Sequence, residues 1–317
     1  FAVGRASQKS PVKAYYALEK PGQKWHIHGY ITLIGCYLLM MFYTTVAGWM
    51  LHYFYLTATG KFTGLDSDAV ASQFNTMLSQ PQVMGFWMVI IVIAGILVCS
   101  IGLQNGLEKV TKVMMISLLF IMVILAINSF FMDGAKEGLS FYLIPDFERM
   151  KEIGIIKTIT GAMNQAFFTL SLGIGAMSIF GSYIGKERSL LGESLNIALL
   201  DTFVAITSGL IIFPACFTFH VDQTSGPGLI FITLPNIFNH IPMGKLWGSL
   251  FFIFMSFAAF STILAVFENI ISCGMELTGW SRKKSSFINA IAIILLSVPC
   301  VLGYNLWSSD IFAVFGG

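Results

Sequence analysis

The most informative part of this sequence is Gly161-Ala-Met-Asn-Gln-Ala-Phe-Phe-Thr-Leu-Ser-Leu-Gly-Ile-Gly-Ala-Met-Ser-Ile-Phe-Gly-Ser-Tyr183. It is long and apolar enough to cross the hydrocarbon core of a bilayer, which takes about 20 residues. Gly173 and Gly175 interrupt it, and each glycine costs about 1 kcal/mol of helix stability relative to alanine. Main-chain groups freed at that depth are tolerated where protein or a cavity satisfies them. The stretch therefore indicates either a broken helix that binds a polar ligand or close helix packing through small residues.

Six further stretches are also long and apolar enough to cross a bilayer. They are Gly29–Leu56, Val83–Leu103, Val110–Phe131, Leu195–His220, Lys245–Cys273 and Phe287–Trp307. Of the 317 residues, 56% are hydrophobic and only 11% are charged, whereas a soluble domain carries about 25% charged residues. This composition excludes an ordinary soluble enzyme, a disordered protein and a basic nucleic-acid binder. The sequence therefore predicts an all-α integral membrane protein with seven spans in a lipid bilayer.

The basic residues are concentrated in alternate connections between these stretches. Segments 1–28, 104–112, 184–194 and 274–286 contain five, two, two and three Lys or Arg residues, which is 12 of the 18 in the chain. Because basic connections tend to stay in the cytoplasm, the first span is expected to run outward. We therefore expect a multi-pass protein of the inner (plasma) membrane. In the outer connection 221–244, the apolar run Ser225–Pro235 is too short to span and predicts a hairpin that dips back onto the bundle.

Polar side chains inside the spans are few, and they mark candidate binding positions. Within Phe257–Thr262, Ala258 and Thr262 share a helix face with Ser261 beside them. Hydroxyl and carbonyl oxygens suit a hard cation such as Na⁺, although hydroxyls also bond back to their own helix. Asp201 lies near the start of the fifth stretch, either as a functional acid inside the bilayer or as an interfacial acid that reaches the cytoplasm.

Five segments, taken in order, resemble the neurotransmitter:sodium symporter family in its bacterial, LeuT-like branch. Gln165–Gly175 followed by Ser182-Tyr183 resembles the sixth family helix. The other four are Ala2–Arg5 (end of helix 2), Phe42–Trp49 (helix 3), Gly226–Ile230 (fourth outer loop) and Phe257–Thr262 (helix 8). The resemblance covers essentially the whole chain. It implies a LeuT-type inverted-repeat bundle in which the seven spans are family helices 3 to 9 and the fourth is unwound in its middle. Residues 1–317 would then be a single transmembrane transporter domain, truncated at both ends.

The function that the resemblance implies is sodium-coupled symport of an amino acid by alternating access. Na⁺ would be the coupling ion, without an organic cofactor. The positions expected to line the substrate pocket are Leu39, Tyr43, Phe168, Ser171, Ile174, Thr262 and Val266. Tyr43 would donate its hydroxyl to the substrate carboxylate, and Phe168 would be an aromatic lid on the extracellular side. Leu39, Ile174 and Val266 would line the side-chain subsite, which predicts a neutral hydrophobic or aromatic L-amino acid.

The resemblance also places the ions and a gate. The expected ligands are Thr169 and Asp201 for the first Na⁺, and Ala258 through its carbonyl, Ser261 and Thr262 for the second. Because Asp201 adds a negative charge beside the first ion, we expect transport to be chloride-independent. The cytoplasmic gate would include Ser182, Tyr183 and Glu276.

Two other classes of function remain to be compared with transport. A non-transporting membrane sensor or subunit of the same fold would keep the binding site without flux. An intramembrane enzyme would need a facing nucleophile and base or paired carboxylates, but the five histidines fall near span ends. The sequence therefore predicts a transporter rather than an enzyme, with Na⁺, an amino acid and lipid as partners. It predicts no nucleic-acid partner and specifies no oligomeric state.

Overall fold

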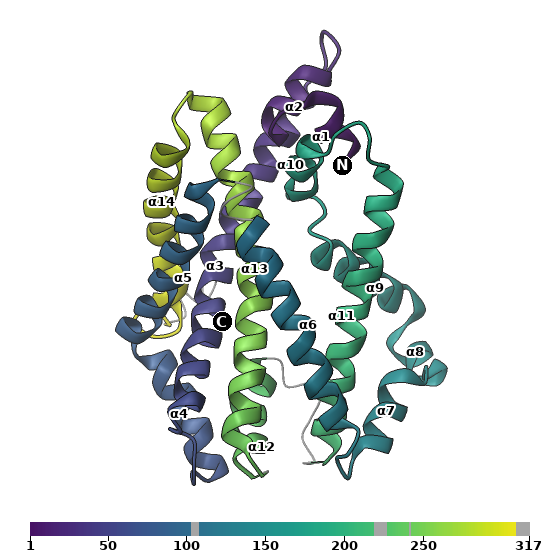
Figure 1. Cartoon of the computed structure of the whole chain (residues 1–317), viewed down its shortest axis with the longest axis vertical. Coiled ribbons are helices and arrows are strands. Elements are labelled where there is room, and N and C mark those ends of the chain that lie inside the picture. Colours follow the sequence, from purple (N-terminus) through teal and green to yellow (C-terminus); the bar gives the residue numbers. More distant parts are fainter. Residues whose placement is uncertain (103–107, 219–226, 241, 309–317) are drawn as a thin grey trace.

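The computed structural model describes residues 1–102, 108–218, 227–240 and 242–308, and this part of the chain is helical without strands (Figure 1). The helices are α1 (Ala2–Ser7), α2 (Pro11–Leu18), α3 (His26–Ala58), α4 (Ser67–Ser79), α5 (Pro81–Ile101), α6 (Lys109–Ser129), α7 (Ala135–Leu143), α8 (Phe147–Ile153), α9 (Ile155–Thr169), α10 (Ala176–Tyr183), α11 (Leu190–Thr218), the π-helix η2 (Leu229–Thr233), α12 (Leu234–His240), α13 (Gly244–Thr278) and α14 (Arg282–Gly303).

Six of these helices are long and apolar enough to cross a membrane: α3, α5, α6, α11, α13 and α14. They coincide with six of the predicted stretches, and the prediction of an all-helical membrane fold is confirmed. The stretch Gly161–Tyr183 is instead divided between α9 and α10. The predicted ends at Leu103 and His220, and Gly226 of the loop motif, lie outside the described residues.

Local sequence sets several helix ends. Asp66 precedes α4 and accepts a hydrogen bond from the Ala69 amide at 2.8 Å, which satisfies one of the free amides of the first turn. Pro81 occupies the first turn of α5, where its missing N–H costs nothing. Gly279 adopts φ 72° and ends α13, and the Ser281 hydroxyl then caps α14. A short turn therefore joins the two helices and keeps them antiparallel neighbours.

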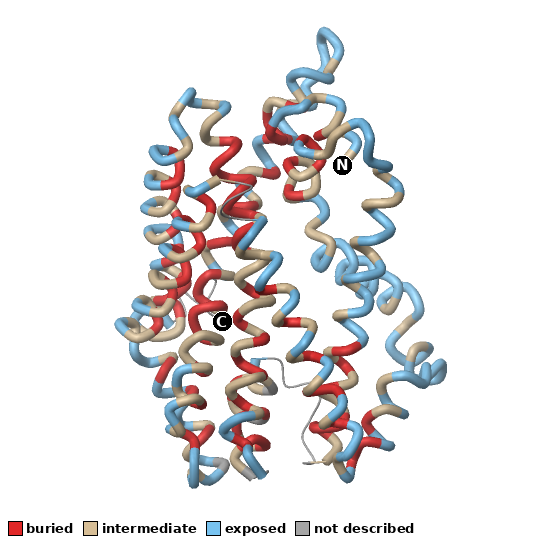
Figure 2. The backbone as a smooth tube through the Cα atoms, viewed as in Figure 1, coloured by how far each residue is buried: buried red, intermediate tan, exposed pale blue. Residues whose placement is uncertain are grey.

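The main core lies where α3 and α13 pack together, with α5 and α14 beside them. Gly48 lets α3 approach α5 closely, because a Cβ there would lie 2.8 Å from the Met88 amide nitrogen of α5. Large side chains such as Met40 of α3 and Phe267 of α13 are fully buried in this core. Figure 2 shows the buried residues gathered along these helices, whereas the α8, α9 and α11 side is mostly exposed.

The other side of the molecule contains α6, α7 and α11. Pro214 interrupts the hydrogen bonds of α11, because proline has no N–H to donate to the Leu210 carbonyl. The Ser129 hydroxyl of α6 lies 2.7 Å from that carbonyl oxygen and 2.8 Å from Ala126 O of its own helix, and it shares its hydrogen between the two acceptors. A side chain from the neighbouring helix thus replaces the missing bond and joins α6 to α11.

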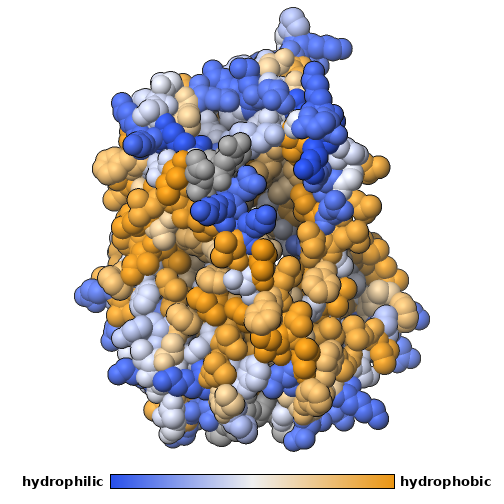
Figure 3. Space-filling view, viewed as in Figure 1, coloured by the Kyte–Doolittle hydropathy of each residue, from blue (hydrophilic) through white to orange (hydrophobic). Residues whose placement is uncertain are grey.

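The two ends of the molecule differ in what they carry. Helices α1 and α2, the α10–α11 connection and the α13–α14 turn lie at one end, and α4, α7 and α12 lie at the other (Figure 1). On the face shown in Figure 3, hydrophobic side chains form a broad band between hydrophilic ends. Within the outer connection predicted to dip back, Phe231 and Leu234 are buried and η2 packs against α4. The opposite end, with α1, α2, the α10–α11 connection and the α13–α14 turn, contains three of the four basic segments.

Candidate substrate and ion site

The interruption between α9 and α10 is a six-residue segment, Leu170–Gly175. Helix α9 ends in a Schellman motif, in which Leu172 N–H bonds to Phe167 O at 2.9 Å and Ser171 N–H to Phe168 O at 3.1 Å. Ser171 has φ 52°, a left-handed conformation that usually requires glycine. Gly173 and Gly175 follow with φ 90° and 79°, and their lack of a Cβ permits this path.

This segment leaves main-chain acceptors free. Across the described parts of the chain, no main-chain amide bonds to the carbonyls of residues 170–173. Leu170 and Ser171 are partly buried and Leu172 and Gly173 are exposed, so a ligand, ion or water can reach these carbonyls and satisfy them. The segment is therefore suited to bind a polar group in the middle of a helix pair.

A cavity of about 570 Å³ lies against this segment. Its walls come from α3, α6, α9, α11 and α13, and they are lined by Leu39, Tyr43, Met115, Leu118, Phe167, Phe168, Thr169, Ser171, Leu172, Ile174, Ile197, Leu200, Asp201, Val204, Ala258, Ser261 and Thr262. Six of the seven positions expected in the substrate pocket are among them. The seventh, Val266, is fully buried one turn further along α13 and is not at the cavity wall. Phe168, the expected lid, lines the cavity and is 62% exposed.

The lining residues of α6 and α11 were not anticipated from the sequence. Met115 and Leu118 come from α6, and Ile197, Leu200 and Val204 come from α11. In an apolar span a residue that faces a cavity is chemically the same as one that faces lipid. Only Asp201 gave a signal on α11, and the turn spacing from it to Ile197 and Val204 would have marked the same helix face.

The two residues expected to bind the first Na⁺ lie in contact. The Thr169 hydroxyl of α9 donates to Asp201 Oδ1 of α11 at 2.8 Å, and both residues line the cavity. Asp201 is the one charged residue among the lining positions. Its carboxylate and the Thr169 hydroxyl, in the residue before Leu170, are oxygen donors of the kind that suits a hard cation.

The second expected set of ligands lies on one face of α13. Ala258, Ser261 and Thr262 all line the cavity, and the Ser261 hydroxyl donates to the Ala258 carbonyl at 2.8 Å. Back-bonding to the helix is therefore present, yet it leaves the oxygen lone pairs of Ser261 unused. Among the described residues, no group of three or more His, Cys, Asp or Glu could hold a metal ion. The available donors are thus hydroxyl and carbonyl oxygens, which fit Na⁺ better than a transition metal.

The three expected gate residues take part in different contacts. The Ser182 hydroxyl donates to Ile179 O of its own helix at 2.7 Å. Glu276 accepts from Ser10 N–H at 3.0 Å through each oxygen and from the Ser10 hydroxyl at 2.7 Å. It therefore fixes the start of α2 against the end of α13. Tyr183 belongs to a separate network.

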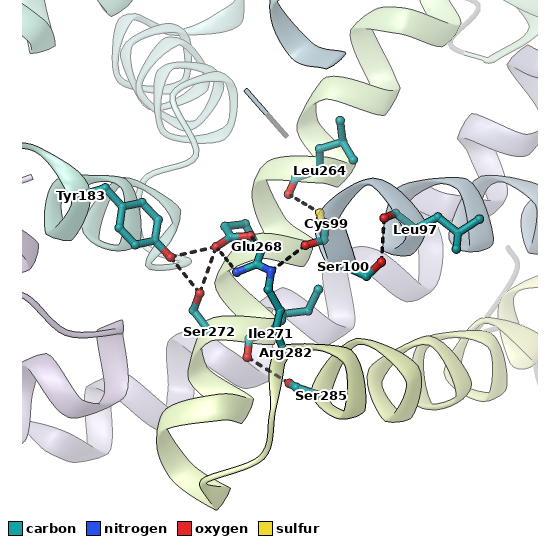
Figure 4. A network of polar contacts seen from close by, with 10 residues as sticks. All are labelled: Leu97, Cys99, Ser100, Tyr183, Leu264, Glu268, Ile271, Ser272, Arg282 and Ser285. Carbon is teal, nitrogen blue, oxygen red and sulfur yellow. Dashed lines mark hydrogen bonds and ion pairs between the residues drawn. The ribbon is translucent and has the colours of Figure 1, made fainter. Parts of the chain in front are cut away.

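That network centres on Glu268, a fully buried acid in α13 (Figure 4). The Tyr183 hydroxyl donates to Glu268 Oε1 at 2.8 Å and lies 2.9 Å from the Ser272 hydroxyl. Arg282 of α14 forms an ion pair with Glu268, and its Nε donates to Cys99 O at 2.7 Å. Four helices, α5, α10, α13 and α14, meet at these contacts. This ion pair was not predicted from the sequence. Glu268 could have indicated it, because an acid inside an apolar stretch such as Lys245–Cys273 is a functional candidate.

Comparison with known proteins gives three concordant results. Residues 68–313 match the sequence profile of the sodium:neurotransmitter symporter family. The sodium-dependent transporter YhdH of Bacillus subtilis is 33% identical over 97% of this chain and 67% of its own length, and a sodium-dependent transporter of Haemophilus influenzae is 30% identical over 92% and 64%. The crystal structure of MhsT in complex with L-phenylalanine matches with a TM-score of 0.87 and 35% identity, over 97% of this chain and 69% of that one. The chain spans about two thirds of the length of these relatives.

Proposed function

The chain belongs to the sodium:neurotransmitter symporter family, and from this premise we propose that it is a sodium-coupled symporter of neutral hydrophobic or aromatic L-amino acids. Residues 1–317 act as a single transmembrane transporter domain in the inner (plasma) membrane. Na⁺ is the coupling ion, no organic cofactor takes part, and transport proceeds by alternating access.

The cavity beside the broken helix is the observation that carries this proposal. Its volume of about 570 Å³ lies within the range of small-molecule sites, roughly 300–1,000 Å³. Leu39, Ile174 and Leu118 supply an apolar wall. Asp201 is the one charged residue among the lining positions, and it already accepts from Thr169. With the Asp201 charge balanced by the first Na⁺, an acidic or a basic substrate side chain would lack a counter-charge, whereas a neutral one needs none.

The polar ends of an amino acid also find partners here. Tyr43 presents a phenolic donor at the cavity wall for the carboxylate. The free carbonyls of residues 170–173 are acceptors for the ammonium group. Phe168 is placed to close over the substrate from the α9 side.

Sodium coupling follows from shared residues. Thr169 lies between Phe168 and the free carbonyls, so an ion held by Thr169 and Asp201 orders the same segment that binds the substrate. By reciprocity, substrate raises the affinity for Na⁺ by the factor by which Na⁺ raises that for substrate. Each charge that moves inward across 100 mV contributes about 2.3 kcal/mol. An inward Na⁺ gradient is therefore able to drive uphill uptake.

Uptake by proteoliposomes tests the proposal. We expect an inward Na⁺ gradient, but not a K⁺ gradient, to drive accumulation of labelled Leu, Tyr or Trp. Asp201→Asn and Thr169→Ala should lower apparent Na⁺ affinity by about tenfold, the effect of losing about 1.4 kcal/mol. Thr202→Ala is the matched control, because among the described residues the Thr202 hydroxyl bonds only to Ala198 O of its own helix, and Thr202 does not line the cavity. Uptake that is indifferent to Na⁺, or that prefers Glu or Lys, would contradict the proposal.

Two variations of the assay separate finer claims. Replacing chloride by gluconate should leave uptake unchanged, since Asp201 already supplies a negative charge beside the first ion. Abolished uptake in that medium would show chloride dependence. Sodium-dependent binding to the purified protein without flux into vesicles would identify a non-transporting sensor or subunit instead.

A further inference from the structure

One carbonyl of the interrupted segment is held differently from its neighbours. The Asn269 side-chain amide of α13 donates to Ile174 O at 2.9 Å. The Cys36 thiol of α3 donates to the same oxygen at 3.0 Å. Asn269 Nδ2 also lies 3.2 Å from Cys36 Sγ. Two helices of the core thus converge on a single main-chain oxygen.

The two donor side chains are buried and have little conformational freedom. Asn269 is 1% exposed and Cys36 is fully buried. The Cys273 thiol, one turn along α13, lies 3.7 Å from Asn269 Oδ1 and so fixes which end of the amide faces the segment. A Cβ on Gly175 would lie 3.3 Å from Asn269 Nδ2 and 2.9 Å from Pro11 Cγ, so the residue after Ile174 is also closely confined.

The contact has a consequence for the cavity. The side chain of Ile174 lines the cavity, whereas Cys36 and Asn269 do not. The carbonyls of residues 170–173 receive no main-chain hydrogen bond in the described chain. The segment is thus free along most of its length and anchored at the residue that supplies part of the apolar wall.

We propose that Asn269, with Cys36, is a positioning residue that sets the depth of the side-chain subsite by holding the Ile174 carbonyl. This inference rests on the proposed function, because it assigns selectivity among neutral amino acids. Neither residue touches substrate. With the carbonyl released, Ile174 can move with the segment, and the cavity discriminates less sharply between side chains of different size.

The variants are chosen to separate positioning from folding. Asn269→Leu keeps the branching of the side chain but removes both donors. Asn289→Leu is its matched control, since Asn289 is equally deep in the bundle but bonds Ser285 and Tyr37 away from the cavity. Cys36→Ala removes the thiol donor, and Cys36→Ser restores a donor at the same atom position. The cysteine pair decides the question by itself if Asn269→Leu does not fold.

The measurement is competition of unlabelled Leu and Trp against sodium-dependent binding of labelled Leu to the purified protein. We expect the ratio of the two apparent affinities to change by about tenfold in Asn269→Leu and about threefold in Cys36→Ala, the range for loss of a buried hydrogen bond. Cys36→Ser and Asn289→Leu should keep the wild-type ratio. Amide hydrogen exchange in the peptide covering residues 170–176 should be faster in Asn269→Leu than in Asn289→Leu.

The possible outcomes distinguish failure of the proposed function from failure of this inference alone. If the wild type binds no amino acid in Na⁺, the proposed function fails and this inference fails with it. If the wild type binds but Asn269→Leu and Cys36→Ala keep its ratio, the inference alone is overturned. An equal shift in Asn289→Leu, or unchanged exchange in the segment, also overturns it.

Discussion

The two walls of the cavity are built in opposite ways. On one side, α13 continues beyond the cavity as an uninterrupted buried run from Val266 to Cys273 and packs along α3. On the other side, α9 has no buried residue, and α11 buries residues only from Thr207 onward. Figure 2 shows the same contrast between red and pale blue helices. The interrupted segment lies between the two walls.

This contrast indicates which wall of the cavity moves at the lower cost in free energy. The α3–α13 wall is held by close packing, which is the main attraction between helices in a bilayer. Helix α9 is joined to α11 by a polar contact, Thr169 with Asp201 at 2.8 Å, whereas α11 packs against α6 and α7 further along, from Thr207 onward. Regions with few buried contacts open at lower free energy than packed ones. We therefore regard α3 and α13 as the scaffold, to which α10 is attached through Tyr183 and Glu268.

The largest effect is expected where the scaffold contains a buried charge. Arg282→Ala removes the partner of Glu268, whose side chain is 0% exposed compared with 22% for Arg282. Breaking a buried ion pair in this way costs about 3–5 kcal/mol, because the remaining charge is left uncompensated. We expect that loss in the free energy of unfolding measured in mixed micelles.

An exposed ion pair provides the control for Arg282. Arg188 and Glu193 pair at 3.1 Å with exposures of 68% and 31%, and such pairs contribute about 0–1 kcal/mol. Arg188→Ala should therefore be nearly neutral. Adding Glu268→Gln to Arg282→Ala should recover much of the loss. Equal stabilities for the Arg188 and Arg282 variants would remove the distinction between the scaffold and the rest.

The next effect compares the last glycine of the interruption with a glycine inside α9. Gly175→Ala places a Cβ 2.9 Å from Pro11 Cγ at a residue with φ 79°, and such strain costs about 1–3 kcal/mol. Gly161→Ala in α9 meets nothing within 4 Å and should stabilise by about 0.5–1 kcal/mol through helix propensity. Thermal unfolding of both variants checks the opposite signs. A Gly175→Ala protein as stable as the wild type would show that α10 is not fixed to the scaffold.

A smaller effect is expected inside the interrupted segment. Ser171 adopts φ 52°, a conformation that costs a residue with a Cβ about 1–2 kcal/mol. Ser171→Gly should therefore raise stability by about 1 kcal/mol, offset in part by the flexibility of glycine in the unfolded chain. Ser171→Ala should not. If both variants behave alike, the left-handed conformation is not a source of strain in this segment.

Much of the helix layout could be predicted because it depends on local sequence. Hydrophobic length placed α3 at Gly29–Leu56 against the observed His26–Ala58, and two glycines marked the break between α9 and α10. The ion-site prediction paired Thr169 with Asp201, and the structure places them in contact.

Other features depend on helix rotation and on distant contacts. Val266 is one turn from Thr262, yet it is buried in the core and does not line the cavity. The partner of Glu268 lies 14 residues away across the α13–α14 turn, and no local pattern specifies that pairing. The apolar lining residues of α6 and α11 could not be predicted from the sequence either, because apolar side chains face both the lipid and the cavity.

The smallest effect on stability is expected for a contact that joins α6 to α11, a helix of the less buried wall. Ser129→Ala removes the donor to Leu210 O, which Pro214 leaves without a helical partner. Hydrogen bonds between membrane helices contribute about 0.6 kcal/mol on average, and we expect a loss of that order in the free energy of unfolding. Ser256→Ala in α13 is the matched control, since Ser256 is also buried but donates to Phe252 O of its own unbroken helix. That carbonyl keeps its main-chain donor, so the control should change stability by less than Ser129→Ala. A larger loss for Ser256→Ala would show that burial, rather than the orphaned carbonyl, sets the cost.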